Sequence, residues 1–233
     1  MKVAAVIPAG GAGKRMGNGP GKQFLLLDNL PVLVHTLRKF ESAERIDHVL
    51  LVVPGADIEF TREMIVSKYG LSKVKHILPG GRERQDSVKN GLDAVAADVG
   101  FVAIHDGVRP FITGEIIDRV ILKGLECNAV TLGVPVKETI KRVDKEGRVG
   151  KTLKREGLWI AQTPQVFKRE IIVEAHRRAC ADGYYATDDA SLVERMGMEV
   201  FVMPGSYENI KITTPDDLAY GEFILKGKHS CSK

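Results

Sequence analysis

The sequence contains few cysteines and no long apolar run. Its three cysteines, Cys127, Cys180 and Cys231, lie far apart and form no CxxC pair, which argues against a zinc site or a disulfide framework. The apolar stretch near the N-terminus is shorter than a membrane span and lacks the h-region and cleavage site of a signal peptide. We therefore expect reduced thiols, no membrane partner and a cytoplasmic location.

Blocks of like charge are also absent from the chain. The 34 basic and 30 acidic residues are spread along all 233 positions and leave a formal net charge of +4. Aromatic residues make up 6% of the chain and do not alternate with basic ones, so the pattern argues against a nucleic acid partner. A pocket for a small anionic molecule accounts for the same mild positive charge.

Short β-branched runs alternate with segments of helical periodicity. The runs predict strands over residues 2–9, 47–54, 73–79, 101–106 and 128–136. Apolar residues at three- and four-residue spacing predict helices over residues 32–40, 57–69 and 87–97. The alternation predicts an α/β fold with a doubly wound, mostly parallel, Rossmann-like sheet, in which ligands bind at the carboxyl ends of the strands.

Residues 137–157 interrupt this alternation. They are rich in charge, place Ile140 and Val143 between polar residues, and contain a Glu-Gly turn signal. We interpret the segment as a β-hairpin arm that projects from a single domain spanning residues 1–228. An isolated hairpin is only marginally stable in water, which favours packing on another surface. A solvated charged ribbon is the alternative.

Beyond the arm, the chain returns to alternating strands and helices. The predicted elements are a strand (158–162), a helix (168–181), a helix from about 188, a strand (199–203) and a last helix. Thr187 is a candidate N-cap of this helix. We interpret Asp188 and Asp189 as partners of the positive helix end, in preference to metal ligands. The last helix should begin at Thr214, which precedes a proline and two acids. Residues 229–233 are predicted to be a frayed tail.

A glycine-rich segment, PAGGAGKRM (8–16), directly follows the first predicted strand. Its three glycines let the backbone approach a ligand and turn N–H groups toward an anion. Lys14, Arg15 and Lys22 add positive charge suited to a polyphosphate. The dinucleotide pattern GxGxxG fails because Met16 replaces its last glycine, and the Walker pattern fails because it needs Ser or Thr at position 15. A nicotinamide oxidoreductase is therefore disfavoured, and a glycine-rich turn without a ligand is the alternative.

Two other junctions between a strand and the next element carry polar residues. In PGGRERQDSV (79–88), Gly80 and Gly81 open the backbone for contacts to a base, and Ser87 supplies a hydroxyl. The alternative is a turn in which Asp86 or Ser87 caps the following helix.

The motif HDGVRP (105–110) ends the fourth predicted strand. Asp106 suits Mg²⁺ or a substrate hydroxyl, and Arg109 suits a phosphate; a purely structural ion pair is the alternative. His105 is not expected to act as a general base, because a substrate phosphate is already ionised.

Seven motifs in order resemble those of the 2-C-methyl-D-erythritol 4-phosphate cytidylyltransferase family, within the sugar-nucleotide pyrophosphorylase and cytidylyltransferase superfamily. They are PAGGAGKRM with Lys22-Gln23-Phe24, PGGRERQDSV, HDGVRPF, PVKETIK, LWIAQTPQVF, TDDASLVE and NIKITTPDDL. The resemblance implies transfer of CMP from CTP to the polyol phosphate with release of pyrophosphate, Mg²⁺ as cofactor, and a homodimer. A departure is Gly21, where the family usually has proline before the loop lysine.

The resemblance also implies roles for individual residues. The implied catalytic residues are Arg15, Lys22 and Lys211. For Lys211, the alternative is a surface lysine without a catalytic role. The implied nucleotide contacts are Ala9, Gly10, Gly11, Ala12, Gly13, Lys14, Gly80, Gly81, Ser87 and Asp106, with Asp106 also the metal ligand. The implied substrate contacts are Asp106, Arg109, Thr139, Arg155, Thr163 and Thr187, with the two arm residues supplied by the partner subunit. A ribitol 5-phosphate cytidylyltransferase and a non-catalytic CTP-binding regulator remain alternatives.

Overall fold

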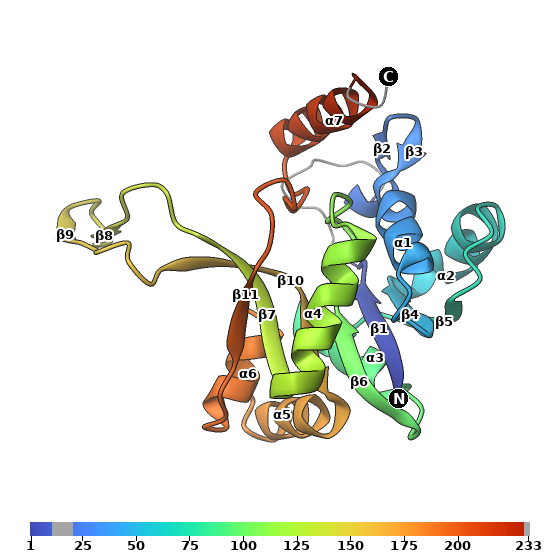
Figure 1. Ribbon diagram of the computed structural model, residues 1–233, viewed down its shortest axis with the longest axis horizontal. Helices are drawn as coiled ribbons and strands as arrows, with labels where there is room; N and C mark the ends of the chain where they lie inside the picture. The colour runs from blue at the N-terminus through green and yellow to red at the C-terminus, as the bar shows by residue number, and fades with distance from the viewer. Residues whose placement is uncertain (11–20, 231–233) are drawn as a thin grey trace.

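The computed structural model of the protein describes residues 1–10 and 21–230, with side chains described to residue 227. Seven strands of this part form one sheet in the order β11-β7-β10-β6-β1-β4-β5 (Figure 1). Their bounds are β1 (Lys2–Pro8), β4 (His48–Val53), β5 (Val74–Pro79), β6 (Val99–Ile104), β7 (Ala129–Pro135), β10 (Trp159–Lys168) and β11 (Phe201–Pro204). All neighbouring pairs are parallel except those of β10, which runs antiparallel to both β6 and β7. The predicted doubly wound, mostly parallel sheet is confirmed.

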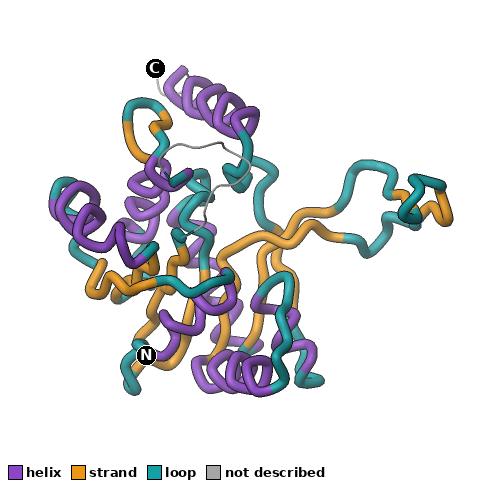
Figure 2. Tube along the Cα trace, turned by 180° about the vertical axis from the view of Figure 1, so that it is seen from behind, coloured by secondary structure: helices purple, strands orange, loops and turns teal. Residues whose placement is uncertain are grey.

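Helices cover both faces of the sheet (Figures 1 and 2). One face carries α1 (Val32–Ser42) and α4 (Gly114–Cys127), and the other carries α3 (Arg84–Asp93), α5 (Arg169–Ala181) and α6 (Asp189–Arg195). Successive residues of a strand point to opposite faces. Accordingly, Ala5 and Ile7 of β1 join the first apolar cluster, whereas Ala4 and Val6 join the second. This two-sided burial explains why the strand sequences read as nearly continuous apolar runs.

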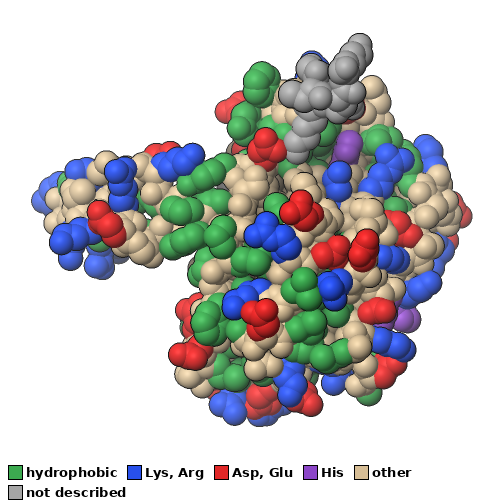
Figure 3. Space-filling model, in the orientation of Figure 1, with side chains coloured by type: hydrophobic (Ala, Val, Ile, Leu, Met, Phe, Trp, Pro, Cys, Tyr) green, Lys and Arg blue, Asp and Glu red, His purple; other side chains and the backbone are tan. Residues whose placement is uncertain are grey.

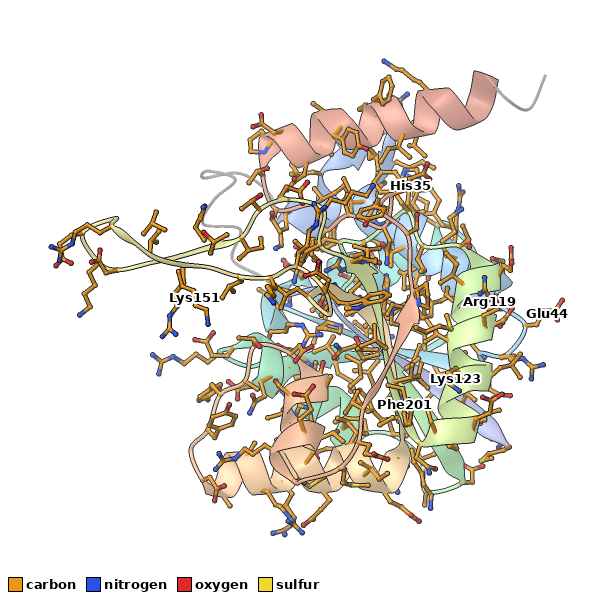
Figure 4. The ribbon with its side chains drawn as sticks, turned by 60° about the vertical axis from the view of Figure 1, so that its left-hand side comes forward. His35, Glu44, Arg119, Lys123, Lys151 and Phe201 are labelled. Carbon is orange, nitrogen blue, oxygen red and sulfur yellow. The ribbon has the colours of Figure 1, made fainter. Side chains whose placement is uncertain are left out.

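Helix α4 was not among the predicted helices, although its signals are present in the sequence. The side chain of Thr113 caps it by accepting a hydrogen bond from the Ile116 N–H. Ile117, Val120 and Ile121 lie at helical spacing and are fully buried against the sheet. Near its end, Lys123 lies over the ring of Phe201 on the edge strand β11, with Nζ 5.7 Å from the ring centroid (Figure 4).

Two predicted helix starts differ from the observed ones. Helix α3 begins three residues earlier than predicted, because Glu83 is its N-cap and the Glu83 N–H donates to Asp86. The alternative that Asp86 or Ser87 is the N-cap is therefore wrong. Asp188, rather than Thr187, caps α6 by accepting a hydrogen bond from the Ser191 N–H.

The predicted helix 57–69 and strand 158–162 also differ in detail. The first is built from a 3₁₀ turn η2 (Gly55–Asp57), a short α-helix α2 (Ile58–Thr61) and a π-helical segment η3 (Arg62–Ser67). The second continues to Lys168 as β10, with a register shift between Gln162 and Gln165. Pro164 obscures this continuation in the sequence, because proline is normally excluded from the middle of a sheet.

The arm forms a small sheet of its own, separate from the main one (Figures 1 and 2). Its strands are β8 (Lys141–Val143) and β9 (Val149–Thr152), paired antiparallel. Asp144 closes the turn by accepting hydrogen bonds from the Glu146 and Arg148 N–H groups, and Gly147 supplies the positive φ of 81°. The predicted hairpin is confirmed, and it projects from the rest of the chain.

The last helix, α7 (Pro215–Ser230), begins as predicted, because Thr214 and Asp217 bond each other's backbone N–H groups. It packs beside the hairpin of β2 (Leu26–Leu27) and β3 (Leu30–Pro31), and the small cluster there includes Leu27, Ile212 and Ile224. The helix includes the first two positions of the predicted tail, and residues 231–233 lie outside the described part. Within the described residues, none of the helices has the length and apolar content needed to cross a membrane.

Candidate active site

The order of the strands places the site. From β1 the chain moves outward to β4 and β5, and then returns to place β6 on the opposite side of β1. Ligands of doubly wound sheets bind where the strand order reverses in this way, outside the carboxyl ends of the strands. Ala9 and Gly10 follow β1, and His105, Asp106 and Arg109 follow β6. The described start of the glycine-rich segment and the HDGVRP motif therefore lie together at the switch point.

Two neighbouring cavities open at this point. The first, which we name the loop cavity, has a volume of about 100 Å³ and is lined partly by Ala9, Gly10 and Lys22. The second, which we name the β10 cavity, has a volume of about 210 Å³ and is lined partly by Arg109, Thr163 and Thr187. Both cavities share Arg84, Asp106 and Lys211. These three side chains therefore stand between the two spaces.

Asp106 is the centre of an ion cluster. Its Oδ1 lies 2.8 Å from Arg84 Nε, and its Oδ2 lies 2.8 Å from Lys211 Nζ and 3.6 Å from Arg109 Nε. Burial opposes ionisation of this carboxyl group, which is 8% exposed. The positive charges of Arg84, Lys211 and Arg109 outweigh burial and hold the pKa of Asp106 well below its usual range. Three cations therefore surround this one carboxylate, and these four side chains together carry a net charge of +2.

Arg84 is the site residue that sequence analysis missed. It is the first residue of α3, and its guanidinium binds Asp106 through Nε and Asp189 through Nη1, each at 2.8 Å. Burial alone would lower the pKa of Arg84, but the two carboxylates raise it. The RER run marked a basic turn in the sequence, without indicating which arginine faces the site.

Lys211 is part of the cluster rather than a simple surface lysine. Its side chain is 34% exposed and reaches Asp106 from the loop before α7. Arg109 approaches the same carboxylate and donates from Nη1 to the Asn209 carbonyl at 2.7 Å. Its buried Nε has no hydrogen-bond partner. Arg109 also lines the β10 cavity, where its guanidinium would suit a phosphate, because guanidinium groups bind phosphate through paired N–H groups.

Thr163 and His105 support the turn that carries Asp106. The Thr163 hydroxyl accepts the Asp106 N–H at 3.1 Å and lies 3.0 Å from His105 Nδ1. Nε2 of His105 lies 3.2 Å from the Arg109 carbonyl oxygen. Burial lowers the pKa of His105 to about 3, so the ring is neutral near pH 7 and holds the turn instead of exchanging protons with a substrate.

This burial predicts a pH dependence of stability. The unfolded chain takes up a proton at His105 near its ordinary pKa of 6.5, whereas the folded chain does not until about 3. The contribution is complete above pH 6.5, and it is lost as the pH falls from there to about 3. We expect His105 to contribute a slope approaching about 1.4 kcal/mol per pH unit to this fall in the free energy of unfolding.

Urea unfolding at several pH values between about 7.5 and about 4.5, with EDTA present, measures this slope. In the variant His105→Gln, the free energy of unfolding should depend less steeply on pH than in the parent, by the amount that about one bound proton contributes. An identical slope in the variant and the parent would contradict the assignment.

The turn after β5 holds the next group of predicted residues. Ser87, which is buried, accepts the Gly81 N–H and donates to the Glu83 carbonyl, both at 3.1 Å. A side chain at Gly81 would overlap with Asp86, so a glycine is required there for packing. The hydroxyl of Ser87 thus shapes the turn, and its predicted role in reading a base remains a prediction. Arg84 connects the turn to Asp106.

The remaining predicted residues fall into three groups. Gly11, Ala12, Gly13, Lys14 and Arg15 lie outside the described residues. Lys22 lies in the short 3₁₀ turn η1 (Lys22–Phe24) and lines the loop cavity. Thr187 lines the β10 cavity. Thr139 and Arg155 lie exposed on the arm, where Arg155 donates to the Lys137 carbonyl at 2.8 Å. Neither arm residue lines the two cavities of its own chain.

Comparison with known proteins decides the family. The model of the 2-C-methyl-D-erythritol 4-phosphate cytidylyltransferase family (IspD) matches residues 3–227. The chain belongs to this family. A family member from Syntrophus aciditrophicus is 52% identical over 225 residues, which cover 97% of this chain and 96% of the relative. One from Pelotomaculum thermopropionicum is 48% identical, covering 97% and 95% respectively.

Solved structures of the family share the fold. The 4-diphosphocytidyl-2C-methyl-D-erythritol synthase of Anaerococcus prevotii superposes with a TM-score of 0.86 at 30% identity, covering 97% of this chain and 96% of the other. The cytidylyltransferase of Thermus thermophilus gives a TM-score of 0.78 at 30% identity, covering 97% and 100%. As a member of the cytidylyltransferase family, the chain is a nucleotidyltransferase.

Proposed function

We propose that the protein transfers CMP from CTP to 2-C-methyl-D-erythritol 4-phosphate, giving 4-diphosphocytidyl-2-C-methyl-D-erythritol and pyrophosphate, in the non-mevalonate pathway of isoprenoid precursor synthesis. The observation that carries this proposal is the cation cluster at the junction of the two cavities. Arg84, Arg109 and Lys211 converge there on one acid. Two anionic reactants must be brought together in this reaction, and positive charge between the two cavities serves that need.

The mechanism is an in-line displacement at phosphorus. The phosphates of CTP occupy the loop cavity, and the phosphate of the acceptor occupies the β10 cavity beside Arg109. An acceptor phosphate oxygen forms a bond to the α-phosphorus, and the bond from that phosphorus to the pyrophosphate oxygen breaks. Lys22, Lys211 and Arg15 neutralise the charge that develops. Catalysis rests on positioning and fixed charge, without a covalent enzyme intermediate.

Mg²⁺ fits this site as an ion that arrives with the nucleotide. Among the described residues there is no group of three or more side chains suited to metal ligation. Mg²⁺ is commonly held by one or two carboxylates together with substrate phosphates. Asp106 is the acid shared by the two cavities and would supply that carboxylate. When bound, the ion would offset negative charge on the phosphates.

We propose that two copies of the chain form a homodimer through the arm. The arm carries eight basic and four acidic residues, which suits a segment that reaches toward anionic substrates. Lys151 lies far out on it, away from its own cavities (Figure 4). Apolar side chains gather where the arm leaves the body (Figure 3), including the partly exposed Trp159, Ile160 and Val202. Docking of a second copy would bury this surface and bring Thr139 and Arg155 to the partner's β10 cavity.

Subunit mixing tests this arrangement. Lys211→Ala and Arg155→Ala should each be nearly inactive alone. A heterodimer of the two contains one site with both defects and one site with neither, so a mixture in equal amounts should recover about one quarter of the parent rate. Pyrophosphate release after mixing and re-equilibration measures the recovery. A mixture no faster than its components would show that Arg155 does not serve a partner's site.

A parallel assay tests the substrate. The protein is incubated with CTP and Mg²⁺, with methylerythritol 4-phosphate in one reaction and ribitol 5-phosphate in the other, and pyrophosphate release is measured. Release with methylerythritol 4-phosphate alone is expected. Release with ribitol 5-phosphate alone would keep the mechanism and change the substrate. CTP binding without release in either reaction would indicate a non-catalytic CTP-binding regulator. We place the reaction in the cytoplasm, without a nucleic acid partner.

A further inference from the structure

A buried chain of polar contacts leads from the cavities to a residue that lines neither of them. His176 lies on α5, and its side chain is 2% exposed. Its Nε2 lies 3.0 Å from Asp189 Oδ1, and the other oxygen of that carboxylate accepts Arg84 Nη1 at 2.8 Å. Arg84 in turn binds Asp106 through Nε. The chain His176–Asp189–Arg84–Asp106 thus joins four segments that are distant in sequence.

Each member of this chain has its orientation fixed by the next. Asp189 is 1% exposed, so its two carboxylate oxygens depend on protein donors. His176 supplies the donor for one oxygen, and Arg84 supplies it for the other. Gln165 also fixes the backbone here, because its Oε1 accepts the Asp189 and Ala190 N–H groups at 3.1 Å each. The carboxylate therefore cannot turn without leaving a buried oxygen unpaired.

We propose that His176 is a positioning residue for the transfer reaction, acting through Asp189 to hold the Arg84 guanidinium between the two cavities. The inference rests on the proposed function. Without the His176 donor, both oxygens of Asp189 compete for Arg84, since guanidinium groups favour paired contacts with a carboxylate. Arg84 then moves toward Asp189 and away from Asp106. Its charge is withdrawn from the place where the two phosphates must meet.

The variant His176→Leu removes the donor at nearly constant volume. We expect kcat to fall about 10- to 100-fold, the scale on which a small misplacement acts at a distance. The KM values for CTP and for the polyol phosphate should change less than about threefold, because neither substrate touches His176. The variant His176→Gln places an amide N–H near the position of Nε2 and should return kcat to within about threefold of the parent.

Two further variants separate positioning from loss of stability. Ile172→Ala removes fully buried apolar packing from the same helix and no hydrogen-bond donor, so it should lower Tm while kcat stays within about threefold. The double variant His176→Leu with Asp189→Asn should be no slower than Asp189→Asn alone, because the two residues act in one chain. The inference is overturned if His176→Leu keeps the kcat of the parent, or if His176→Gln is as slow as His176→Leu. It is also overturned if Ile172→Ala is as slow as His176→Leu, or if the double variant is slower than Asp189→Asn by the full effect of His176→Leu.

The parent protein in the same assay distinguishes this inference from the proposed function. Turnover by the parent together with an insensitive His176→Leu variant overturns the positioning role alone. An absence of pyrophosphate release from the parent with either polyol phosphate overturns both.

Discussion

Replacement of Lys211 with alanine is expected to lower kcat about 10²–10³-fold at saturating substrates, the scale for removing one group aimed at developing charge. Lys211 faces both cavities and lies 2.8 Å from Asp106, so its charge is available to the phosphates from either side. Asp106 keeps Arg84 and Arg109 in the variant. The fold should therefore survive, and the loss should appear in turnover rather than in the amount of folded protein.

Pyrophosphate release at saturating CTP measures this effect, with Tm as a check on folding. Lys123→Ala is the matched control, because Lys123 is an exposed lysine on α4 that pairs with Glu126. Its kcat should equal that of the parent. Near-normal turnover by Lys211→Ala would remove Lys211 from the catalytic set and would leave the nucleotide side of the mechanism to Lys22 and Arg15.

Replacement of Arg84 with methionine is expected to lower the free energy of unfolding by about 3–5 kcal/mol, as for other buried ion pairs that lose one partner. Among the described residues, the buried carboxylate of Asp189 would then keep His176 as its side-chain partner. For a chain of this size, the loss corresponds to a fall in Tm of roughly 6–20 °C. Activity should fall as well, because Arg84 is one of the cations between the cavities.

The double variant Arg84→Met with Asp189→Asn tests the electrostatic origin of this loss. Removing the unpaired charge should restore a large part of the lost stability, although Asp106 still lacks one of its partners. Arg178→Met, an exposed arginine on α5, serves as the control and should change Tm by no more than about 2 °C. If the double variant were less stable than Arg84→Met alone, lost packing rather than an unpaired charge would be the cause.

The parts of the site that the strand pattern alone predicted lie directly after strands. Asp106 and Arg109 follow a strand with a clear apolar run, and the fold brings the carboxyl ends of the parallel strands to one edge. Gly10 was predicted for the same reason, whereas Ala9 was assigned from the resemblance. Lys211 was assigned from the resemblance of its motif, and the structure places its Nζ against Asp106.

Arg84 was missed because its role depends on a distant residue. Its second partner, Asp189, lies 105 positions further along the chain, and a local sequence pattern cannot indicate such a contact. The missed helix α4 is a different case. Its cap and apolar spacing were readable, so the omission was an error of interpretation. The antiparallel course of β10 could not be read locally, since strand direction is set by pairing and Pro164 masks the strand.

Strand β10 constrains which changes of length the chain can accept. It leaves the arm, passes Thr163 beside Asp106 and then presents Gln165 to Asp189. A deletion or insertion of one residue between the arm and Thr163 would turn each following side chain to the opposite face of the sheet. Additions at the tip, near Gly147, change no such register. Related chains should therefore vary in length at the outer turn of the arm and keep the return segment 153–162 at constant length.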